Sequence, residues 1–327
     1  MTERALTRSW QSPVGSLMAQ FIEEKQACGY GYIAESALLG RFDRFLAGHG
    51  LSEPALPRDL VERWVAKRPH ESPGTQRLRF GLTRHFATFL THQGCVAYVP
   101  DSHRMPKRGS RFVPRIFTHD EIRRLFQAAD DLPFCPYSSL RTHVVPELFR
   151  LLYSCGLRAS EALHLHVADV DLEVGVLTIH QSKFRKDRLV PLTPPLTQRL
   201  RQYADVVGSR PDEAIFFPSP HGGAYDCSPI YKVFRHLLWV SRIPHGGRGQ
   251  GPRLHDLRHT FAVHRLAQWY REGADLQAKL PVLATYMGHL NLRGTQRYLQ
   301  LTAEIFPELS RRLDAAYGEC IPRRTQP

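Results

Sequence analysis

The sequence predicts a mainly α-helical protein with a small antiparallel β-sheet, an α+β fold in two domains. Three observations predict this: a length of 327 residues, apolar residues at helical spacing along most of the chain, and one pair of β-rich segments. At roughly 150 residues per domain, the length favours two domains. We expect a helical domain at 1–100, a basic linker at 101–115, a mixed domain at 116–313 and a flexible tail at 314–327.

The first hundred residues carry four amphipathic stripes. In each stripe, apolar residues recur three and four positions apart, which is the spacing of one helix face. The helices are expected at 14–22, 38–46, 60–64 and 78–90. Basic residues of the fourth helix fall away from its apolar stripe, so we place them on its open face, either as ordinary solvated side chains or as contacts to phosphates. They are Arg77, Arg79, Arg84 and His85.

Residues 101–115 form a basic segment without apolar periodicity. Lys and Arg alternate there with Pro and Gly, which is typical of a linker. The segment leads to Thr118-His-Asp-Glu121, a capping-box pattern that opens a helix through Phe126. The second domain therefore starts at about this point.

The second domain is expected to be mostly helical, with one β-hairpin. Segments 174–180 and 188–192 are rich in β-formers and are separated by a cationic turn. Apolar spacing predicts further helices, two of which begin at Pro146 and Pro281. Their expected ranges are 146–155, 160–165, 196–206, 228–240, 255–269 and 281–287.

The charge balance favours a polyanionic partner. Lys and Arg number 44 against 31 Asp and Glu, which gives a net charge of +13. The most apolar region is interrupted by Glu147 and Arg150, so no membrane helix is expected. The start of the chain lacks the apolar stretch of a signal peptide, which favours the cytoplasm.

The six cysteines stand far apart, without a C-x-x-C pair. We expect neither a disulfide framework nor a zinc knuckle, and we interpret Cys155 as a buried small hydrophobe rather than a nucleophile. One metal alternative is a zinc site at His255, His259 and His264, but this set lacks the glutamate of an H-E-x-x-H motif. Another rests on His164 and His166, which would straddle a helix rather than share a face. No metal and no cofactor is expected.

Several residues match what phosphodiester cleavage without a metal requires, namely permanent cations, a nucleophile and proton donors. Arginine suits the first role because its planar guanidinium pairs with two phosphate oxygens and stays charged. Arg158 follows a tight turn at Gly156, and Arg258 shares a helix face with His255, so that this pair can reach one phosphate. The remaining candidates are Lys183 at the hairpin tip, His289 after a glycine, and Tyr298.

In this order and spacing, the motifs resemble those of the tyrosine recombinase family, the phage-type integrases. They are Gly156-Leu-Arg158-Ala-Ser-Glu161, Lys183 before Arg188-Leu-Val-Pro-Leu192, His255-Asp-Leu-Arg258-His259, Gly288-His289, and Tyr298 nine residues after that histidine. The similarity covers about 118–313 and implies a tyrosine recombinase catalytic domain. The helical domain and basic linker are similar to the family's core-binding domain, which clamps DNA.

The resemblance implies a site-specific DNA recombinase or integrase that cuts and rejoins strands through a 3′-phosphotyrosine, without metal or ATP. Tyr298 would attack the scissile phosphate, with His255 as general base. Arg158 and Arg258 would clamp the non-bridging oxygens. These are the roles of the family's motif residues at the matching positions.

Three more motif residues have implied roles. Lys183 would protonate the departing 5′-oxygen, although its turn differs from a Gly-Lys-Gly pattern, which leaves Arg185 and Lys186 as rivals. His289 would hydrogen-bond the phosphate, and Glu161 would orient the helix of Arg158. The interval between the Arg258 and His289 motifs also carries extra residues at 268–279, which could change contacts between protomers.

The implied partners are double-stranded DNA sites, held by four protomers, and the expected location is the cytoplasm at the nucleoid. A partner recombinase or a DNA-bending protein is left open. Two alternatives remain, a catalytically silent DNA-binding accessory protein of a multi-recombinase element and a type IB topoisomerase. Residues expected to position the DNA are Arg77, Arg79, Arg84, Lys107, Arg108 and Arg111.

Overall fold

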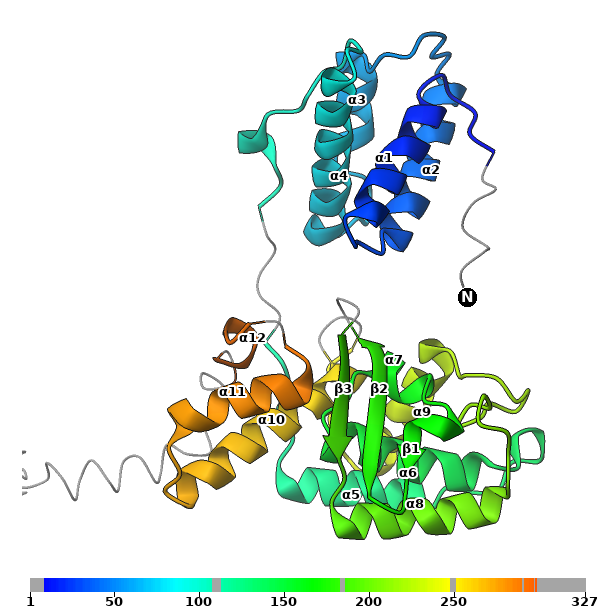
Figure 1. Ribbon diagram of the computed structural model, residues 1–327, viewed down its shortest axis with the longest axis vertical. Helices are drawn as coiled ribbons and strands as arrows, with labels where there is room; N and C mark the ends of the chain where they lie inside the picture. Colours follow the sequence, from blue (N-terminus) through cyan, green and yellow to red (C-terminus); the bar gives the residue numbers. More distant parts are fainter. Residues whose placement is uncertain are drawn as a thin grey trace, which may run out of the picture. The chain divides into compact units, whose positions relative to one another are not determined.

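The computed structural model describes residues 9–107, 113–182, 186–247, 251–289, 291–296 and 298. The chain divides into two compact units, Met1–Phe112 and Val113–Pro327, and each has its own hydrophobic core (Figure 1). The predicted fold class, mainly helical with a small antiparallel sheet, is confirmed. Within the described residues, no helix is long and apolar enough to cross a membrane.

The first unit is a bundle of four helices. They are α1 (Gly15–Ala27), α2 (Ile33–Gly48), α3 (Arg58–Val65) and α4 (Pro73–His92). All four were predicted from their apolar stripes, and the aromatic residues Phe21, Phe42 and Phe86 of those stripes are each 1% exposed or less. Ser72 caps α4 by accepting a hydrogen bond from the main chain of Thr75, with Pro73 at the first helical position.

The prediction that Arg79 lies on the open face of α4 is wrong. Its side chain is 2% exposed, and its guanidinium is 2.5 Å from the carboxylate of Glu71. The same group donates to the main-chain oxygen of Ala66 at 3.0 Å and lies 5.6 Å from the Trp64 ring. The segment between α3 and α4 therefore folds over this side of α4 and buries the arginine with its own counter-charge.

The start of the basic segment packs onto the first unit. Arg77 donates to the main-chain oxygen of Pro106 at 2.8 Å, and Arg84 donates to that of Pro100. The short helix η1 (Ser102–Arg104) ends in a residue that pairs with Glu62. Lys107 is exposed, whereas the predicted contacts Arg108 and Arg111 lie outside the described residues.

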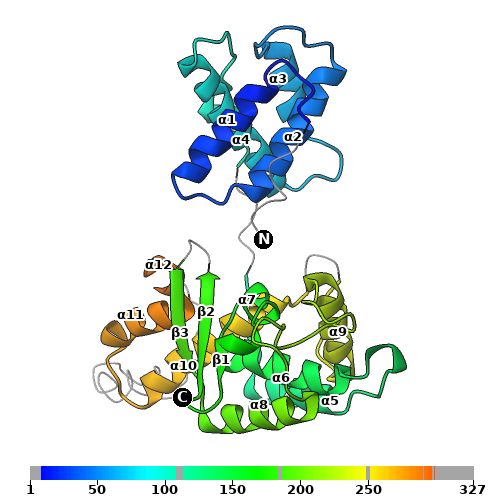
Figure 2. The same cartoon turned by 45° about the vertical axis from the view of Figure 1, so that its right-hand side comes forward.

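The second unit places helices around a three-stranded antiparallel sheet (Figure 2). The sheet order is β1 (Val170–Asp171), β2 (Val176–Ser182) and β3 (Lys186–Pro191). The described helices are α5 (His119–Asp130), α6 (Arg141–Ser154), α7 (Ala159–Leu163), α8 (Pro194–Val207), α9 (Cys227–Val240), α10 (Leu254–Arg271), α11 (Leu276–Met287) and α12 (Arg293–Gln296), with short turns η2 (Pro136–Ser138) and η3 (Val167–Asp169).

Two helices begin earlier than predicted. The sequence indicated starts at Pro146 and Pro281, but α6 and α11 each begin five residues before the proline, at Arg141 and Leu276. Asp275 caps α11 by accepting hydrogen bonds from the main chain of the first turn, which fixes the start independently of the proline. The segment 268–279 therefore consists of the end of α10, a tight turn and the start of α11.

Two local predictions in this unit are confirmed. The capping box at the start of α5 is formed, because Thr118 and Glu121 exchange hydrogen bonds at 3.2 and 3.0 Å. Cys155 is 2% exposed, and burial raises the pKa of its thiol to about 12, so the thiol is not a nucleophile.

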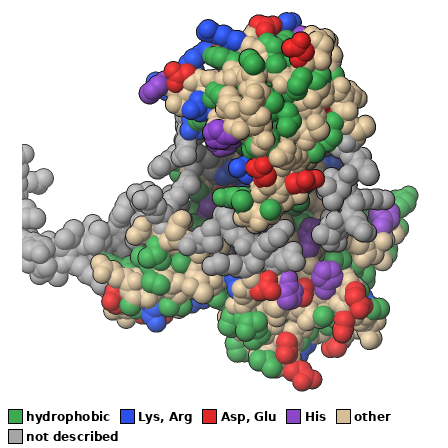
Figure 3. Space-filling model, turned by 45° about the horizontal axis from the view of Figure 1, so that its top comes forward, with side chains coloured by type: hydrophobic (Ala, Val, Ile, Leu, Met, Phe, Trp, Pro, Cys, Tyr) green, Lys and Arg blue, Asp and Glu red, His purple; other side chains and the backbone are tan. Residues whose placement is uncertain are grey.

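The net positive charge does not by itself locate a ligand surface. Figure 3 shows basic, acidic and histidine side chains mixed on the face in view. The candidate site therefore has to be located from the buried charges and their partners.

Candidate active site

Arg158 is held at the start of α7 by a glycine turn. Gly156 has a φ of +57°, and a Cβ there would lie 2.4 Å from the ring of Phe261, so only glycine fits. The side chain of Arg158 is 20% exposed, with one nitrogen 2.5 Å from a Glu161 oxygen. Its Nη2 donates to the main-chain oxygen of Gly288 at 3.0 Å, which connects the first motif to the Gly-His motif.

Arg258 projects from α10 into the interior and is 1% exposed. Its Nη1 donates to the oxygen of Gly156 and its Nη2 to that of Met287, both at 2.6 Å. Among the described residues, no carboxylate lies within salt-bridge distance of this guanidinium. Burial and the charge of Arg158 lower the pKa of Arg258 to about 10, so it remains a cation at neutral pH.

The two guanidinium groups are neighbours, since they bind the main-chain oxygens of consecutive residues, Met287 and Gly288. Two adjacent cations with a single shared carboxylate nearby, Glu161, favour an anion. The geometry thus brings together the arginines of the first and third motifs at the end of α11.

Tyr298 completes this cluster. It is 2% exposed, and its hydroxyl is 3.3 Å from Nδ1 of His259. Its ring lies 6.1 Å from that of His289, and it packs in a small core with Phe261 and Met287.

The two motif histidines are neutral in the site. Burial, followed by the charges of Arg258 and Arg158, lowers the pKa of both His255 and His289 to about 4. His289 is 2.8 Å from the hydroxyl of Thr295 through Nδ1. The ring of His255 lies edge-on to that of His259, with centroids 4.6 Å apart. Neutral imidazoles can accept a proton at neutral pH.

Glu161 binds the guanidinium groups of both Arg158 and Arg188. Its carboxylate accepts hydrogen bonds from the main chain of Arg158 at 2.9 Å and from the two Nη atoms of Arg188 at 3.0 and 2.8 Å. Burial alone would raise the pKa of Glu161, but these hydrogen bonds and the two guanidinium charges lower it to about 2. The resemblance implies that Glu161 orients the helix of Arg158, and this role stays a prediction; in the structure Glu161 contacts the main chain and the guanidinium of Arg158.

Three residues of the cluster had no role in the reaction that the sequence implies: Arg188, His259 and Thr295. Arg188 and His259 lay within the quoted motifs, but the pairing of Arg188 with Glu161 joins positions 27 apart and could not be derived from local spacing. No sequence pattern indicated a role for Thr295. The candidate acid Lys183 and its rival Arg185 lie outside the described residues, and of Lys186 only the main chain is described.

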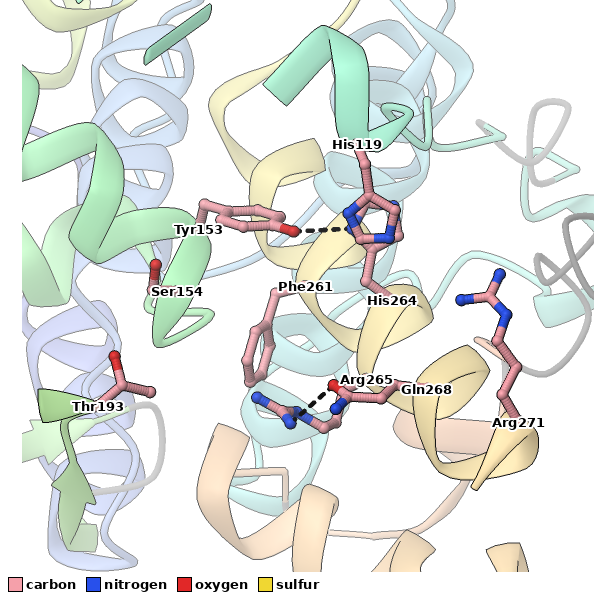
Figure 4. Close-up of a pocket in the computed structure, with 9 residues that line it drawn as sticks. All are labelled: His119, Tyr153, Ser154, Thr193, Phe261, His264, Arg265, Gln268 and Arg271. Carbon is pink, nitrogen blue, oxygen red and sulfur yellow. Dashed lines mark hydrogen bonds between the residues drawn. The ribbon is translucent and has the colours of Figure 1, made fainter. Parts of the chain in front are cut away.

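The histidines of the zinc alternative do not converge. His259 contacts Tyr298. His264 instead stacks on His119, with ring centroids 3.9 Å apart, and its Nδ1 shares a hydrogen bond with the hydroxyl of Tyr153 at 2.8 Å (Figure 4). Those last three residues line a separate cavity of about 280 Å³. Within the described ranges, no group of three or more His, Cys, Asp and Glu side chains is placed to hold a metal ion.

A larger groove of about 710 Å³ opens beside Arg158. It is lined by residues of α7, η3 and β2 and of the segment between α7 and η3; the lining includes His164, His166 and His180. The partly exposed guanidinium of Arg158 is therefore reachable from this groove, whereas that of Arg258 is enclosed.

Known sequences are similar to this chain over most of its length. The model of the phage integrase family matches residues 115–304. The putative integrase/recombinase y4rB of Sinorhizobium fredii is 32% identical over 306 residues, covering 92% of this chain and 96% of that protein. The tyrosine recombinase XerD of Pseudomonas aeruginosa is 30% identical over 284 residues, covering 84% of this chain and 87% of that protein.

Solved structures share the fold. XerH recombinase in a post-cleavage complex with palindromic difH substrate superposes with a TM-score of 0.58 at 17% identity, covering 92% of this chain and 84% of that one. A lambda integrase dimer bound to a COC′ core site gives a TM-score of 0.58 at 15% identity, covering 85% and 95%. On the family match and the identity to two relatives over most of their lengths, the chain belongs to the phage integrase family, the tyrosine recombinases.

Proposed function

We propose that the protein is a site-specific DNA recombinase or integrase that cuts and rejoins DNA strands through a 3′-phosphotyrosine at Tyr298, without metal or ATP. The observation that carries the proposal is the buried tyrosine beside Arg258, a buried cation with no carboxylate partner among the described residues. A DNA phosphate supplies the missing negative charge. The relatives named integrases and recombinases support the same class of reaction.

In the cleavage step, the Tyr298 oxygen forms a bond to phosphorus while the bond from phosphorus to the 5′-oxygen breaks. The ordinary pKa of tyrosine is near 10, so attack at neutral pH needs a proton acceptor. His255 takes this proton, because its neutral imidazole lies in the field of Arg258 and Arg158, where the phosphate binds. His259 holds the tyrosine hydroxyl before DNA arrives.

The other motif residues act on the phosphate and the leaving group. Arg158 and Arg258 bind the non-bridging oxygens and stabilise the charge of the transition state, and His289 donates a further hydrogen bond. Lys183 gives a proton to the departing 5′-oxygen. A 5′-hydroxyl from another strand then reverses the step, which exchanges strands with no loss of phosphodiester bonds.

DNA binding is assigned to both units. Arg77, Arg84 and Lys107 are the described basic residues proposed to contact the DNA backbone from the first unit, and Arg108 and Arg111 are proposed with them. Arg79 is left out because Glu71 already neutralises it. Two DNA sites held by four protomers, at the nucleoid in the cytoplasm, form the proposed working assembly.

A suicide-substrate assay tests the proposed reaction. Nicked duplexes from the flanks of the protein's own gene trap a covalent intermediate, because the short cleaved fragment diffuses away. Denaturing gels without added metal should show an adduct with the natural protein and none with Tyr298→Phe. The matched control is Tyr153→Phe, which removes another hydroxyl bonded to a histidine, that of His264, in a separate cavity (Figure 4).

The control should form the adduct at the natural rate. An adduct in Tyr298→Phe would remove this residue from the role of nucleophile. Salt-sensitive DNA binding without any adduct would favour the accessory DNA-binding protein. Relaxation of supercoiled plasmid without exchange between two sites would favour the topoisomerase.

A further inference from the structure

Arg188 on β3 joins Glu161 to the end of α11, and no step of the proposed reaction uses it. It is buried, with 8% of its side chain exposed, and it stands opposite Ile179 in the β2–β3 register. All three of its guanidinium nitrogens donate hydrogen bonds. Hydrogen bonds from all three nitrogens restrict the orientation of the planar guanidinium.

Its first link is to the carboxylate that holds Arg158. Nη1 and Nη2 of Arg188 donate to the two oxygens of Glu161 at 3.0 and 2.8 Å. The same carboxylate also binds the main chain and the guanidinium of Arg158. The orientation of Glu161, and with it that of Arg158, therefore depends on the planar fork of Arg188.

Its second link is to the end of α11, which lies alongside β3 (Figure 1). Nε donates to the main-chain oxygen of Tyr286 at 3.0 Å. A Cβ on Gly288 would lie 2.9 Å from Nη1 of Arg188, so the guanidinium packs directly on this glycine. Gly288 has a φ of +67° and ends the helix immediately before His289.

Both links lead to the two candidate phosphate-binding arginines, whose main-chain acceptors lie at the end of α11. The Gly288 oxygen accepts a hydrogen bond from Arg158, and the oxygen of Met287 accepts one from Arg258. A turn displaced by the loss of Arg188 would shift the acceptors of both candidate phosphate-binding arginines. A displacement of about 1 Å in such a group can cost about 100-fold in rate.

We propose that Arg188 is a positioning residue for strand cleavage, which sets Arg158 through Glu161 and the turn at Gly288 through Tyr286. It touches neither the phosphate nor the tyrosine, and it acts only through the residues that do. Lysine cannot replace it, because an ammonium group lacks the planar fork that reaches the Glu161 carboxylate and the Tyr286 oxygen together. The inference rests on the proposed function.

The test compares two substrates with one variant, Arg188→Lys. One substrate carries the normal scissile phosphate, and the other carries a methylphosphonate there, in which a methyl group replaces one charged oxygen. Arginines that neutralise that charge matter less for the uncharged analogue. A defect that arises from a misplaced Arg158 should therefore shrink on the methylphosphonate substrate, whereas a general loss of folded protein affects both substrates equally.

We expect Arg188→Lys to cleave the phosphodiester about 10- to 100-fold more slowly than the natural protein, with less than about a 3-fold loss on the methylphosphonate. Arg158→Ala should show the same pattern with a larger loss. The matched control is Arg199→Lys, which alters another arginine bound to a buried glutamate, Glu147, away from the site, and it should cleave both substrates normally.

The ratio of the two rates is independent of the folded fraction, because both substrates meet the same molecules. Where Arg188→Lys yields no folded protein, Glu161→Gln tests the same link from the other side and should give the same ratio. Equal losses on the two substrates, or no loss, would overturn the positioning role. The absence of any adduct with the natural protein on either substrate would instead refute the proposed function.

Discussion

Two arginines, one in each unit, are equally buried but differently compensated. Arg79 on α4 is 2% exposed, and Arg258 on α10 is 1% exposed. Arg79 is paired with Glu71 at 2.5 Å. Among the described residues, Arg258 has main-chain oxygens as its hydrogen-bond acceptors, and no carboxylate is within salt-bridge distance. A buried cation without a counter-charge costs several kcal/mol, and of these two arginines Arg258 is the one that bears this cost.

The difference separates a structural charge from one kept for a ligand. Glu71 neutralises Arg79 within the first unit, so this arginine has no charge to offer DNA. The field of Arg258 instead reaches its neighbours and helps to lower the pKa of His255 and His289 to about 4. Burial alone therefore does not distinguish the two roles, whereas the presence of an acidic partner does.

The largest expected effect comes from Arg258→Met. We predict that the rate of covalent adduct formation falls by about 100- to 1,000-fold, because a donor to the transition-state charge is lost. The free energy of unfolding should stay the same or rise, because an apolar side chain of similar size replaces an uncompensated charge. Single-turnover cleavage and urea unfolding measure the two quantities. A destabilised variant with normal cleavage would contradict the comparison.

For Arg79→Met in the first unit, we expect lower stability and an unchanged cleavage rate. Removing this partner leaves the Glu71 carboxylate, 8% exposed, with the Arg68 main chain as its remaining hydrogen-bond donor among the described residues, so the free energy of unfolding should fall by about 3 kcal/mol. The cleavage rate per folded molecule should not change. The double variant Arg79→Met with Glu71→Gln serves as control and should recover part of the lost stability. Unchanged stability in the single variant would show that the pair does not hold α4.

Acid should weaken the second unit through its neutral histidines. His264 is 6% exposed, and burial with the nearby His119 lowers its pKa to about 4, whereas unfolded histidine titrates near 6.5. The unfolded state binds more protons between these values, so stability is complete above pH 6.5 and is lost as pH falls toward 4. We expect a loss of about 1–2 kcal/mol at pH 5 from this residue.

Chemical unfolding at several pH values measures this loss. His264→Gln is the control, and it should reduce the slope of stability against pH without removing it, because the pKa values of His255 and His289 are lowered too. An identical slope in the variant would show that His264 is not held neutral.

The smallest effect is expected for the surface arginines of the first unit. Arg77→Ala and Arg84→Ala should each reduce the slope of log affinity against log salt by about 1 if each residue contacts one phosphate. Filter binding or fluorescence anisotropy with duplex DNA measures the slope. Arg104→Ala, which removes an arginine already paired with Glu62, is the control and should leave it unchanged.

Much of the architecture could be predicted from local sequence patterns. Amphipathic spacing predicted most helices of both units but not the four-residue α12, and the capping box predicted the start of α5. The starts of α6 and α11 could not be predicted from their prolines, because each proline is accommodated within a helix that begins earlier. β1 was missed because it has only two residues and exists through its pairing with β2.

The candidate site likewise contains residues that the sequence motifs indicated and residues that depend on tertiary contacts. The motifs indicated Arg158, His255, Arg258, His289 and Tyr298, and the structure brings these residues to the end of α11 and the start of α10. Local spacing could not distinguish Arg79 from a DNA contact, because its neutralisation depends on how the loop before α4 folds. Nor could it reveal Arg188, whose partners come from α7 and α11.

The proposed phosphotyrosine is tested most directly by identifying the residue and the DNA end in the trapped adduct. Protease digestion of the adduct followed by mass spectrometry locates the modified peptide, and end-labelled strands show which terminus is free. We predict a 3′-phosphate linked to Tyr298 and a free 5′-hydroxyl on the released strand. Linkage to another residue, or cleavage that requires a metal and leaves no adduct, would contradict the assignment.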